Sequence, residues 1–174
     1  MAAYYIMEDL VRPQFSVYYK ILGIYQIVGS IIGFLFLLYS LYQQGWSFVQ
    51  LLAIDIVLFL CCLFSLICGL LCMKSHDMAL SLSIVNQVLQ LLGFGISGVL
   101  YIYTSGVNFS IALDFTHELT IIPKFGISKM RLGFNNNSGN SFIEINIVAL
   151  AIIIWIDRVQ QKIKKYKYSD NQVN

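Results

Sequence analysis

The sequence predicts an all-α membrane protein, a four-transmembrane-helix bundle with a small β-containing extracytoplasmic segment between the third and fourth spans. Hydrophobic residues make up 58% of the 174-residue chain and charged residues only 11%, and the mean hydropathy is +0.74. Soluble globular domains do not have this composition. The prediction rests on four apolar runs, at Tyr18–Tyr42, Val49–Met73, Met78–Tyr103 and Phe142–Val159. The first three exceed the roughly 20 residues that a helix needs to cross a bilayer.

The four runs organise residues 1–174 as a single membrane domain with one larger connection. The expected spans cover approximately residues 18–42, 49–73, 78–103 and 142–161. We expect residues 104–141 to form an extracytoplasmic, β-hairpin-like cap, and residues 162–174 to form a basic cytoplasmic tail. The chain that remains is too short for a separate soluble catalytic domain of ordinary size.

The distribution of basic residues predicts the orientation of the chain. Three of the eleven, Lys124, Lys129 and Arg131, fall on the side of the expected cap. The other eight are Arg12, Lys20, Lys74, Arg158, Lys162, Lys164, Lys165 and Lys167. Because basic residues near span ends stay in the cytoplasm, we expect a multi-pass protein of the inner (plasma) membrane with both termini cytoplasmic.

The first two spans contain few polar or small residues. Gly29 and Gly33 in the first span are four residues apart and share a helix face, which lets a neighbouring helix approach closely, either within one subunit or across a dimer seam. The second span contains Asp55, the best single candidate for a functional residue, because a carboxylate in hydrocarbon has to face a cavity or a partner. Alternatively, Asp55 reaches the outer interface or hydrogen-bonds to a serine or tyrosine.

All four cysteines lie in the second span. A disulfide-stapled outer module is therefore excluded. No C-x-x-C pair is present for thiol redox chemistry, whereas Cys61, Ser65, Cys68 and Cys72 share one helix face. This pattern favours close packing by small residues over chemistry.

The third span is the most polar. Asn86 and Gln90 are four residues apart on one face, and Gln87 lies beside them. Such amides either hydrogen-bond between helices or line a water path. Gln26 enters the membrane at a similar depth from the same side, so we expect it to contact Asn86 or Gln87. The candidate intramembrane polar site comprises Asp55, Gln26, Asn86, Gln87 and Gln90, and the candidate helix-packing residues are Gly29, Gly33 and Gly93.

The segment between the third and fourth spans has a strand-like pattern. Residues 108–115 alternate polar or small side chains with apolar ones, the period of a half-buried strand. A lone hairpin is only marginally stable in water, so we expect this one to dock on the helix ends or on a neighbouring subunit. Phe109 and Phe115 should supply that assembly surface, with Ser110 and Asp114 turned outward.

His117 in the same segment is a weak candidate for a metal ligand. A metal site usually needs three protein ligands, and here Glu118 is adjacent in an extended chain with no second histidine nearby. We interpret this stretch as a solvated turn, and we expect no metal, no cofactor and no catalytic residue. The sequence contains no motif for a reaction, so the protein is expected not to be an enzyme.

The fourth span has the shortest apolar core, residues 147–156. Its helix should continue into the cytoplasm, where lysines make it basic. Attraction to anionic lipid headgroups explains those lysines, and binding to nucleic acid is not expected.

Two segments of the sequence resemble known proteins. Residues 21–33 (ILGIYQIVGSIIG) and 82–90 (LSIVNQVLQ) are similar to small uncharacterised four-span proteins of bacterial inner membranes, from AT-rich genomes. The resemblance implies a location and no activity. A likeness to tetraspanins in outline is rejected, because residues 104–141 lack the Cys-Cys-Gly signature and the paired cysteines.

These observations favour a non-enzymatic membrane protein that acts by oligomerisation or by binding a partner in the bilayer. In the version we prefer, the oligomer perturbs or permeabilises the membrane, with Asn86, Gln87 and Gln90 near the inner face of the assembly. In size and topology the chain also resembles the small accessory and effector membrane proteins of bacterial antiviral systems. The alternative is a small carrier or ligand-binding protein that uses Asp55 and the polar face of the third span. The sequence identifies no small-molecule ligand.

Overall fold

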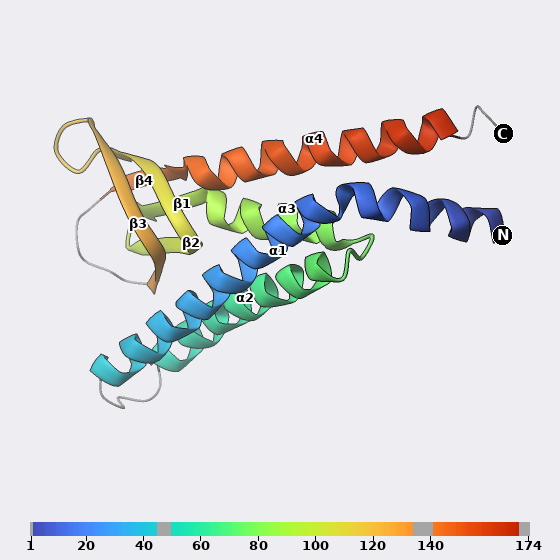
Figure 1. Ribbon diagram of the computed structural model, residues 1–174. Coiled ribbons are helices and arrows are strands. Elements are labelled where there is room, and N and C mark those ends of the chain that lie inside the picture. Colours follow the sequence, from blue (N-terminus) through green and yellow to red (C-terminus); the bar gives the residue numbers. More distant parts are fainter. Residues whose placement is uncertain (1, 45–49, 134–140, 171–174) are drawn as a thin grey trace.

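All of the strands lie between the third and fourth helices of the chain (Figure 1). The computed structural model describes residues 2–44, 50–133 and 141–170, with side chains described for residues 15–42, 55–133, 141–166 and 168–169. The elements are α1 (Ala2–Gln44), α2 (Gln50–Met73), α3 (Ala79–Leu91), β1 (Leu92–Ile96), β2 (Val99–Asp114), β3 (Thr120–Gly133), β4 (Phe142–Asn146) and α4 (Ile147–Asp170).

The prediction of an all-α bundle of four spanning helices is wrong. Residues 92–146 contain a four-stranded antiparallel sheet. Within the described residues only two helical segments, Phe15–Tyr42 and Asp55–Met73, are long and apolar enough to cross a membrane. The expected span at 78–103 is helical only as far as Leu91, and the expected span at 142–161 begins as a strand.

The third expected span changes from helix to strand for local reasons. Gly93 and Gly95 lower the helix propensity of the segment that follows Leu91, and the residues from Val99 onward are mostly β-branched or aromatic. Ser97 and Gly98 have φ values of 50° and 83°, as a tight two-residue hairpin turn requires. Hydropathy alone does not distinguish an apolar strand from an apolar helix.

The sheet closes partly on itself. β1 pairs with β2 and with β4, and β4 also pairs with β2, all antiparallel. Three straight strands cannot all be antiparallel to one another, so β2 has to turn between its two halves. The turn lies at a register shift between Thr104 and Val107 in the pairing with β3, where Gly106 has a φ of 108°. A bulge of this kind bends a strand and re-aims its side chains.

The helices form two pairs that meet the sheet (Figure 1). α1 and α2 lie against each other, and α3 and α4 run side by side into β1 and β4. A cluster of Leu22, Cys72, Ala79, Leu80, Ile156 and Val159 joins all four helices. A second cluster of Leu37, Leu58, Cys62, Tyr103 and Met130 joins α1 and α2 to the sheet.

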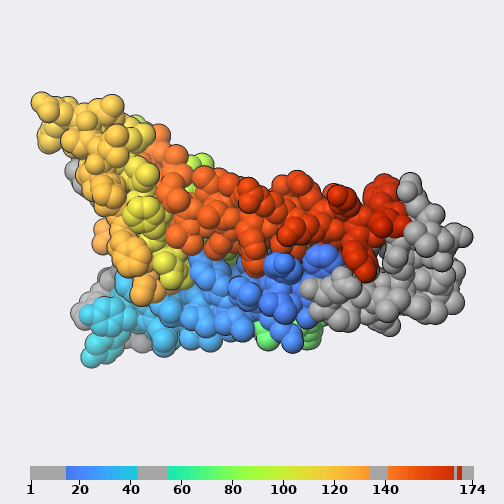
Figure 2. Space-filling model, turned by 45° about the horizontal axis from the view of Figure 1, so that its top comes forward, coloured from blue at the N-terminus to red at the C-terminus, as the bar shows by residue number. Residues whose placement is uncertain are grey.

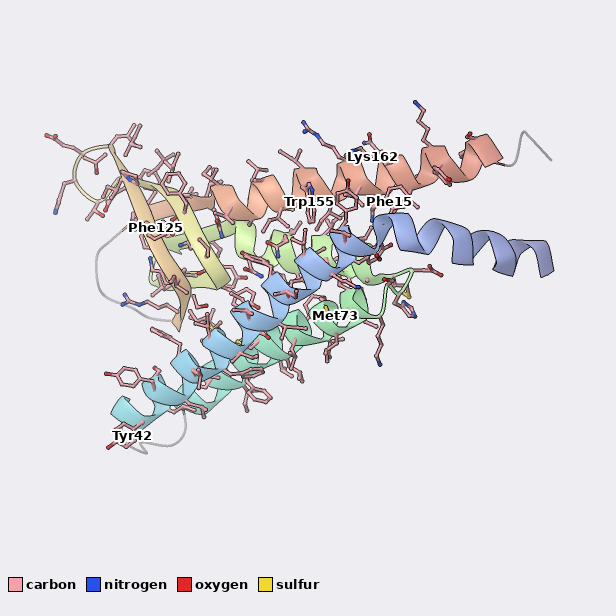
Figure 3. All side chains as sticks on the ribbon, in the orientation of Figure 1. Phe15, Tyr42, Met73, Phe125, Trp155 and Lys162 are labelled. Atoms are coloured by element: carbon pink, nitrogen blue, oxygen red, sulfur yellow. The ribbon has the colours of Figure 1, made fainter. Side chains whose placement is uncertain are left out.

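Basic residues lie at both ends of the molecule. Lys162 is on the part of α4 that is remote from the sheet (Figure 3), and Lys164 and Lys165 follow it. Lys124 and Lys129 lie on β3. The side chains of Arg12 and Lys167, which the orientation argument also used, lie outside the described residues, as do residues 171–174 of the expected tail.

Candidate functional site

The sheet exposes its apolar side. Residues paired directly across neighbouring strands point to the same face, and the pairs include Val107 with Ile127, Phe109 with Phe125, and Ile111 with Ile145. We call this surface the outer face, formed by Val107, Phe109, Ile111, Ile121, Phe125, Ile127, Ile143 and Ile145, all of which are exposed. Figure 2 shows the hairpin of β2 and β3 as a gold lobe that stands out from the helices.

The opposite, inner face of the sheet is polar and buried. Asn108 and Ser110 of β2, and Glu144 and Asn146 of β4, are each less than 5% exposed. The expectation that Ser110 points outward is therefore wrong, because Ser110 is buried. Phe109 and Phe115 are exposed, so they do not pack on the helix ends of the same chain. Their contact with a neighbouring subunit, the other alternative, stays a prediction. Sequence alternation shows which residues share a face but not which face is covered.

Four amides gather beneath the sheet, and we call Gln26, Asn86, Gln87 and Gln90 the amide cluster. The Ser83 hydroxyl donates to Gln26 Oε1 at 3.3 Å, so α1 and α3 meet here. The Asn86 Nδ2 group donates to Ser65 Oγ of α2 at 3.1 Å. The backbone N–H of Ser105 donates to Gln90 Oε1 at 2.9 Å. The cluster thus lies where α1, α2, α3 and the bulge of β2 meet.

The amide cluster has more hydrogen-bonding capacity than the described residues satisfy. All four side chains are at least 98% buried. Six atoms have no partner among the described groups, namely Gln26 Nε2, Asn86 Oδ1, Gln87 Nε2, Gln87 Oε1, Gln90 Nε2 and the nearby Ser105 Oγ. At about 1–3 kcal/mol for each, six unpaired groups would cost on the order of 10 kcal/mol. That cost equals the whole net stability of a typical domain. In native proteins, buried polar atoms of this kind are usually paired with protein groups or with ordered water.

A buried charged cluster on the sheet was missed by the sequence reasoning. Ser110 Oγ donates to Glu144 Oε1, while Lys124 Nζ and Lys129 Nζ lie 3.4 and 3.6 Å from Glu144 Oε2. Lys124 also lies 4.9 Å from the centre of the Phe142 ring. The only sequence signal was an acid flanked by isoleucines at the start of an apolar run, together with lysines on a strand-like segment. Their meeting depends on the pairing of β4 with β2, which is not local in sequence.

Asp55 lies apart from the amide cluster. It is ten residues before Ser65 on α2, so about 15 Å along the helix axis separates it from the Ser65–Asn86 contact. Its Oδ2 atom is buried without a hydrogen-bond partner in the described part of the chain. The structure therefore brings together Gln26, Asn86, Gln87 and Gln90 but not Asp55.

The candidate packing glycines contact strands as well as helices. A Cβ on Gly29 would lie 2.7 Å from the Ser105 carbonyl oxygen, and a Cβ on Gly33 would lie 2.5 Å from Met130 Cε. α1 therefore crosses β2 and β3 closely at these positions. Gly93 belongs to β1 and not to a helix. The close crossing of α1 and α2 instead involves Gly23, whose Cβ would lie 2.9 Å from the Gly69 carbonyl oxygen.

The cysteines and His117 form no reactive site in the described residues. All four cysteines are free, with Cys62 Sγ 3.5 Å from Met130 Sδ and Cys72 Sγ 3.3 Å from Ser83 Oγ. No group of three His, Cys, Asp or Glu residues within the described ranges could hold a metal ion. His117 is exposed in the turn between β2 and β3.

The arrangement suits hydrogen bonding in a buried interior and contact with apolar surroundings outside. No family model matches the chain, and no curated protein or solved structure is significantly similar to it.

Proposed function

We propose that the protein is a non-enzymatic integral membrane protein that acts as an assembly of copies, joined through β3 and the outer face of the sheet. The observation that supports this most is the reversed part of the sheet, β2 from Val107 onward with the facing parts of β3 and β4, where polar side chains are buried and large apolar ones are exposed. Water does not favour a continuous apolar face of this kind, which marks contact with lipid or with protein.

The two long apolar helices support placement in a membrane. Only 39% of the window in Phe15–Tyr42 and 33% of the window in Asp55–Met73 is buried within the chain. The core helix of a soluble protein would be mostly buried, so these surfaces fit lipid contact.

We further propose that two more crossings are part helix and part strand. α3 with β1 extends about 36 Å, and β4 with the first ten residues of α4 about 32 Å, at standard rises per residue. Both lengths match a hydrocarbon core of about 30 Å. The protein is then multi-pass in the inner membrane, with both ends of the chain and the basic part of α4 on the cytoplasmic side.

The free edge of β3 favours a second copy of this chain over lipid alone. The sheet order is β1-β4-β2-β3, and the pairing of β1 with β2 closes the other side. β3 therefore has the open edge among the described strands. Lipid cannot hydrogen-bond to unpaired strand groups, whereas a second β3 can, in a two-fold, self-complementary contact.

Asn86, Gln87 and Gln90 are enclosed within one copy. A pore between copies that these residues line is therefore not part of the proposal.

Cross-linking in lipid nanodiscs tests the assembly. With a short bis-maleimide, Ile127→Cys on β3 should give a covalent dimer. Tyr42→Cys should not, because Tyr42 lies near the C-terminal end of α1, away from the sheet (Figure 3). The unmodified chain gives the background from the native cysteines.

A charge on the outer face should separate the copies. Phe125→Lys places an ammonium group in the contact, and Tyr168→Lys makes a matched change on α4, since the two side chains are 77% and 76% exposed. Native mass spectrometry should show dimers for the natural chain and for Tyr168→Lys, and monomers for Phe125→Lys. A monomeric natural chain, or a dimer that survives Phe125→Lys, contradicts the proposal.

A further inference from the structure

We infer that the amide cluster is a binding site for a small, uncharged solute that both donates and accepts hydrogen bonds, such as urea or a simple amide. This inference is independent of the assembly through β3. It rests on Gln26, Asn86, Gln87 and Gln90, which are buried where α1, α2, α3 and the bulge of β2 meet.

The unpaired atoms define the hydrogen bonds that the ligand makes. Gln87 offers both its Nε2 donor and its Oε1 acceptor, Gln90 offers a donor, and Asn86 offers an acceptor. The oxygen and nitrogen of these amides could be exchanged in the structure. Such an exchange changes which atoms lack a partner, but the ligand would still have to both donate and accept hydrogen bonds. Asn86 and Gln90 lie about one helical turn apart on α3, roughly 6 Å along the helix axis, so one small ligand could reach both amides.

The surroundings of the cluster select against charge. Its hydrogen-bond partners are hydroxyl groups of Ser65 and Ser83 and the backbone N–H of Ser105. The buried carboxylate of Glu144 is already engaged by Ser110, Lys124 and Lys129. A charged ligand would lose its hydration here without gaining an opposite charge.

Folding alone gives no reason for Gln87. Both of its polar atoms lack partners among the described groups, and an apolar side chain of similar size would avoid that cost. The side chain is therefore better explained by a ligand than by the packing of α3.

Urea and guanidinium provide a matched pair of probes, because they share size and shape and differ in charge. The protein, labelled with ¹⁵N in glutamine side chains and held in lipid nanodiscs, is titrated with each at millimolar, non-denaturing concentration. We expect urea to shift the Gln87 and Gln90 side-chain amide signals in a saturable way, and guanidinium to leave them unchanged. The signal lost in Gln87→Leu assigns Gln87.

In Gln87→Leu the response of Gln90 to urea should weaken by more than about tenfold, because one lost hydrogen bond has roughly that value and the variant removes both a donor and an acceptor. Gln161→Leu, the same change at an exposed position of α4, should retain the full response. If Gln87→Leu does not fold, the comparison of urea with guanidinium on the natural chain tests whether the amide cluster binds an uncharged solute.

Three results would overturn the inference. They are an equal response to guanidinium, a urea response that Gln87→Leu retains, and amide signals that exchange magnetisation with water but show no saturable response to urea. The last result would reduce the cluster to a site for structural water.

Discussion

Glu144 has surroundings that its neighbours in the chain do not suggest. It lies between two isoleucines that are exposed on the outer face, while its own carboxylate is buried against Ser110, Lys124 and Lys129. Strand alternation produces this difference, because successive side chains point to opposite faces. The lysines that face it come from β3, two strands away in the sheet order.

Glu144→Gln should destabilise the protein by about 1–3 kcal/mol, the range for losing hydrogen bonds to a charged group. The amide can still accept from Ser110, but the two lysines lose their charge partner. Because each lysine is about a third exposed, solvent screening keeps the loss below that of a fully buried pair. Thermal unfolding in detergent measures it. Glu118→Gln in the exposed turn is the control, and an equal effect of the two changes contradicts this assignment.

Asp114 should report the order of the turn between β2 and β3. The side chain and the backbone N–H of Thr116 hydrogen-bond to its carboxylate and hold the pKa of Asp114 below its usual range. The contribution to stability is therefore present above the unfolded pKa and is lost as the pH falls through the lower, folded pKa. The Thr116 amide proton signal should titrate with a midpoint below about 3.9. A midpoint at or above that value would show that the contact is absent.

At the scale of elements, the crossing of α1 over β2 requires a residue without a side chain. A Cβ on Gly29 would meet backbone of Ser105 at 2.7 Å, whereas a Cβ on Gly126 of β3 would meet nothing within 4 Å. Alanine in a helix gains about 1 kcal/mol over glycine, but forcing atoms into a tight contact costs about 1–3 kcal/mol. Since the contact is with backbone that the bulge holds in place, the cost should exceed the gain.

Gly29→Ala should therefore lower the free energy of unfolding by about 1 kcal/mol. Gly126→Ala should leave it unchanged or raise it by about 0.4–1 kcal/mol, because alanine restricts the unfolded chain. Thermal unfolding of both variants under one set of conditions gives the comparison. A Gly29→Ala variant as stable as Gly126→Ala would show that α1 and β2 are not in close contact.

The elements that sequence predicts best are those that one local property determines. Length and hydropathy are sufficient for α2 and for the apolar part of α1, although α1 begins at Ala2, well before the predicted span. The amides of α3 were identified from their spacing on a helix. The end of α3 at Leu91 was missed because an apolar strand and an apolar helix have the same hydropathy. The contact of Glu144 with Lys124 depends on strand register and order, which residues distant in the sequence determine.

At the scale of the whole molecule, polar groups are concentrated inside and apolar groups outside. The outer face of the sheet and the exposed sides of α1 and α2 are apolar, whereas the amide cluster and the Glu144 carboxylate are buried. Transmembrane barrels with a polar interior have the same arrangement, because lipid replaces water as the solvent. In this molecule a sheet with a buried polar face and an exposed apolar face occurs together with two long apolar helices.

The number of membrane crossings can be decided by labelling two positions, His117 and Lys164. If only α1 and α2 cross, the turn that contains His117 lies on the same side as α4. If the segments α3–β1 and β4–α4 also cross, His117 lies outside and Lys164 inside. His117→Cys should then react with a membrane-impermeant maleimide in intact spheroplasts, and Lys164→Cys only after the membrane is opened. The native cysteines lie within α2, so the unmodified chain gives the background. Protection of both positions until permeabilisation would show two crossings and exclude the part-helix, part-strand spans.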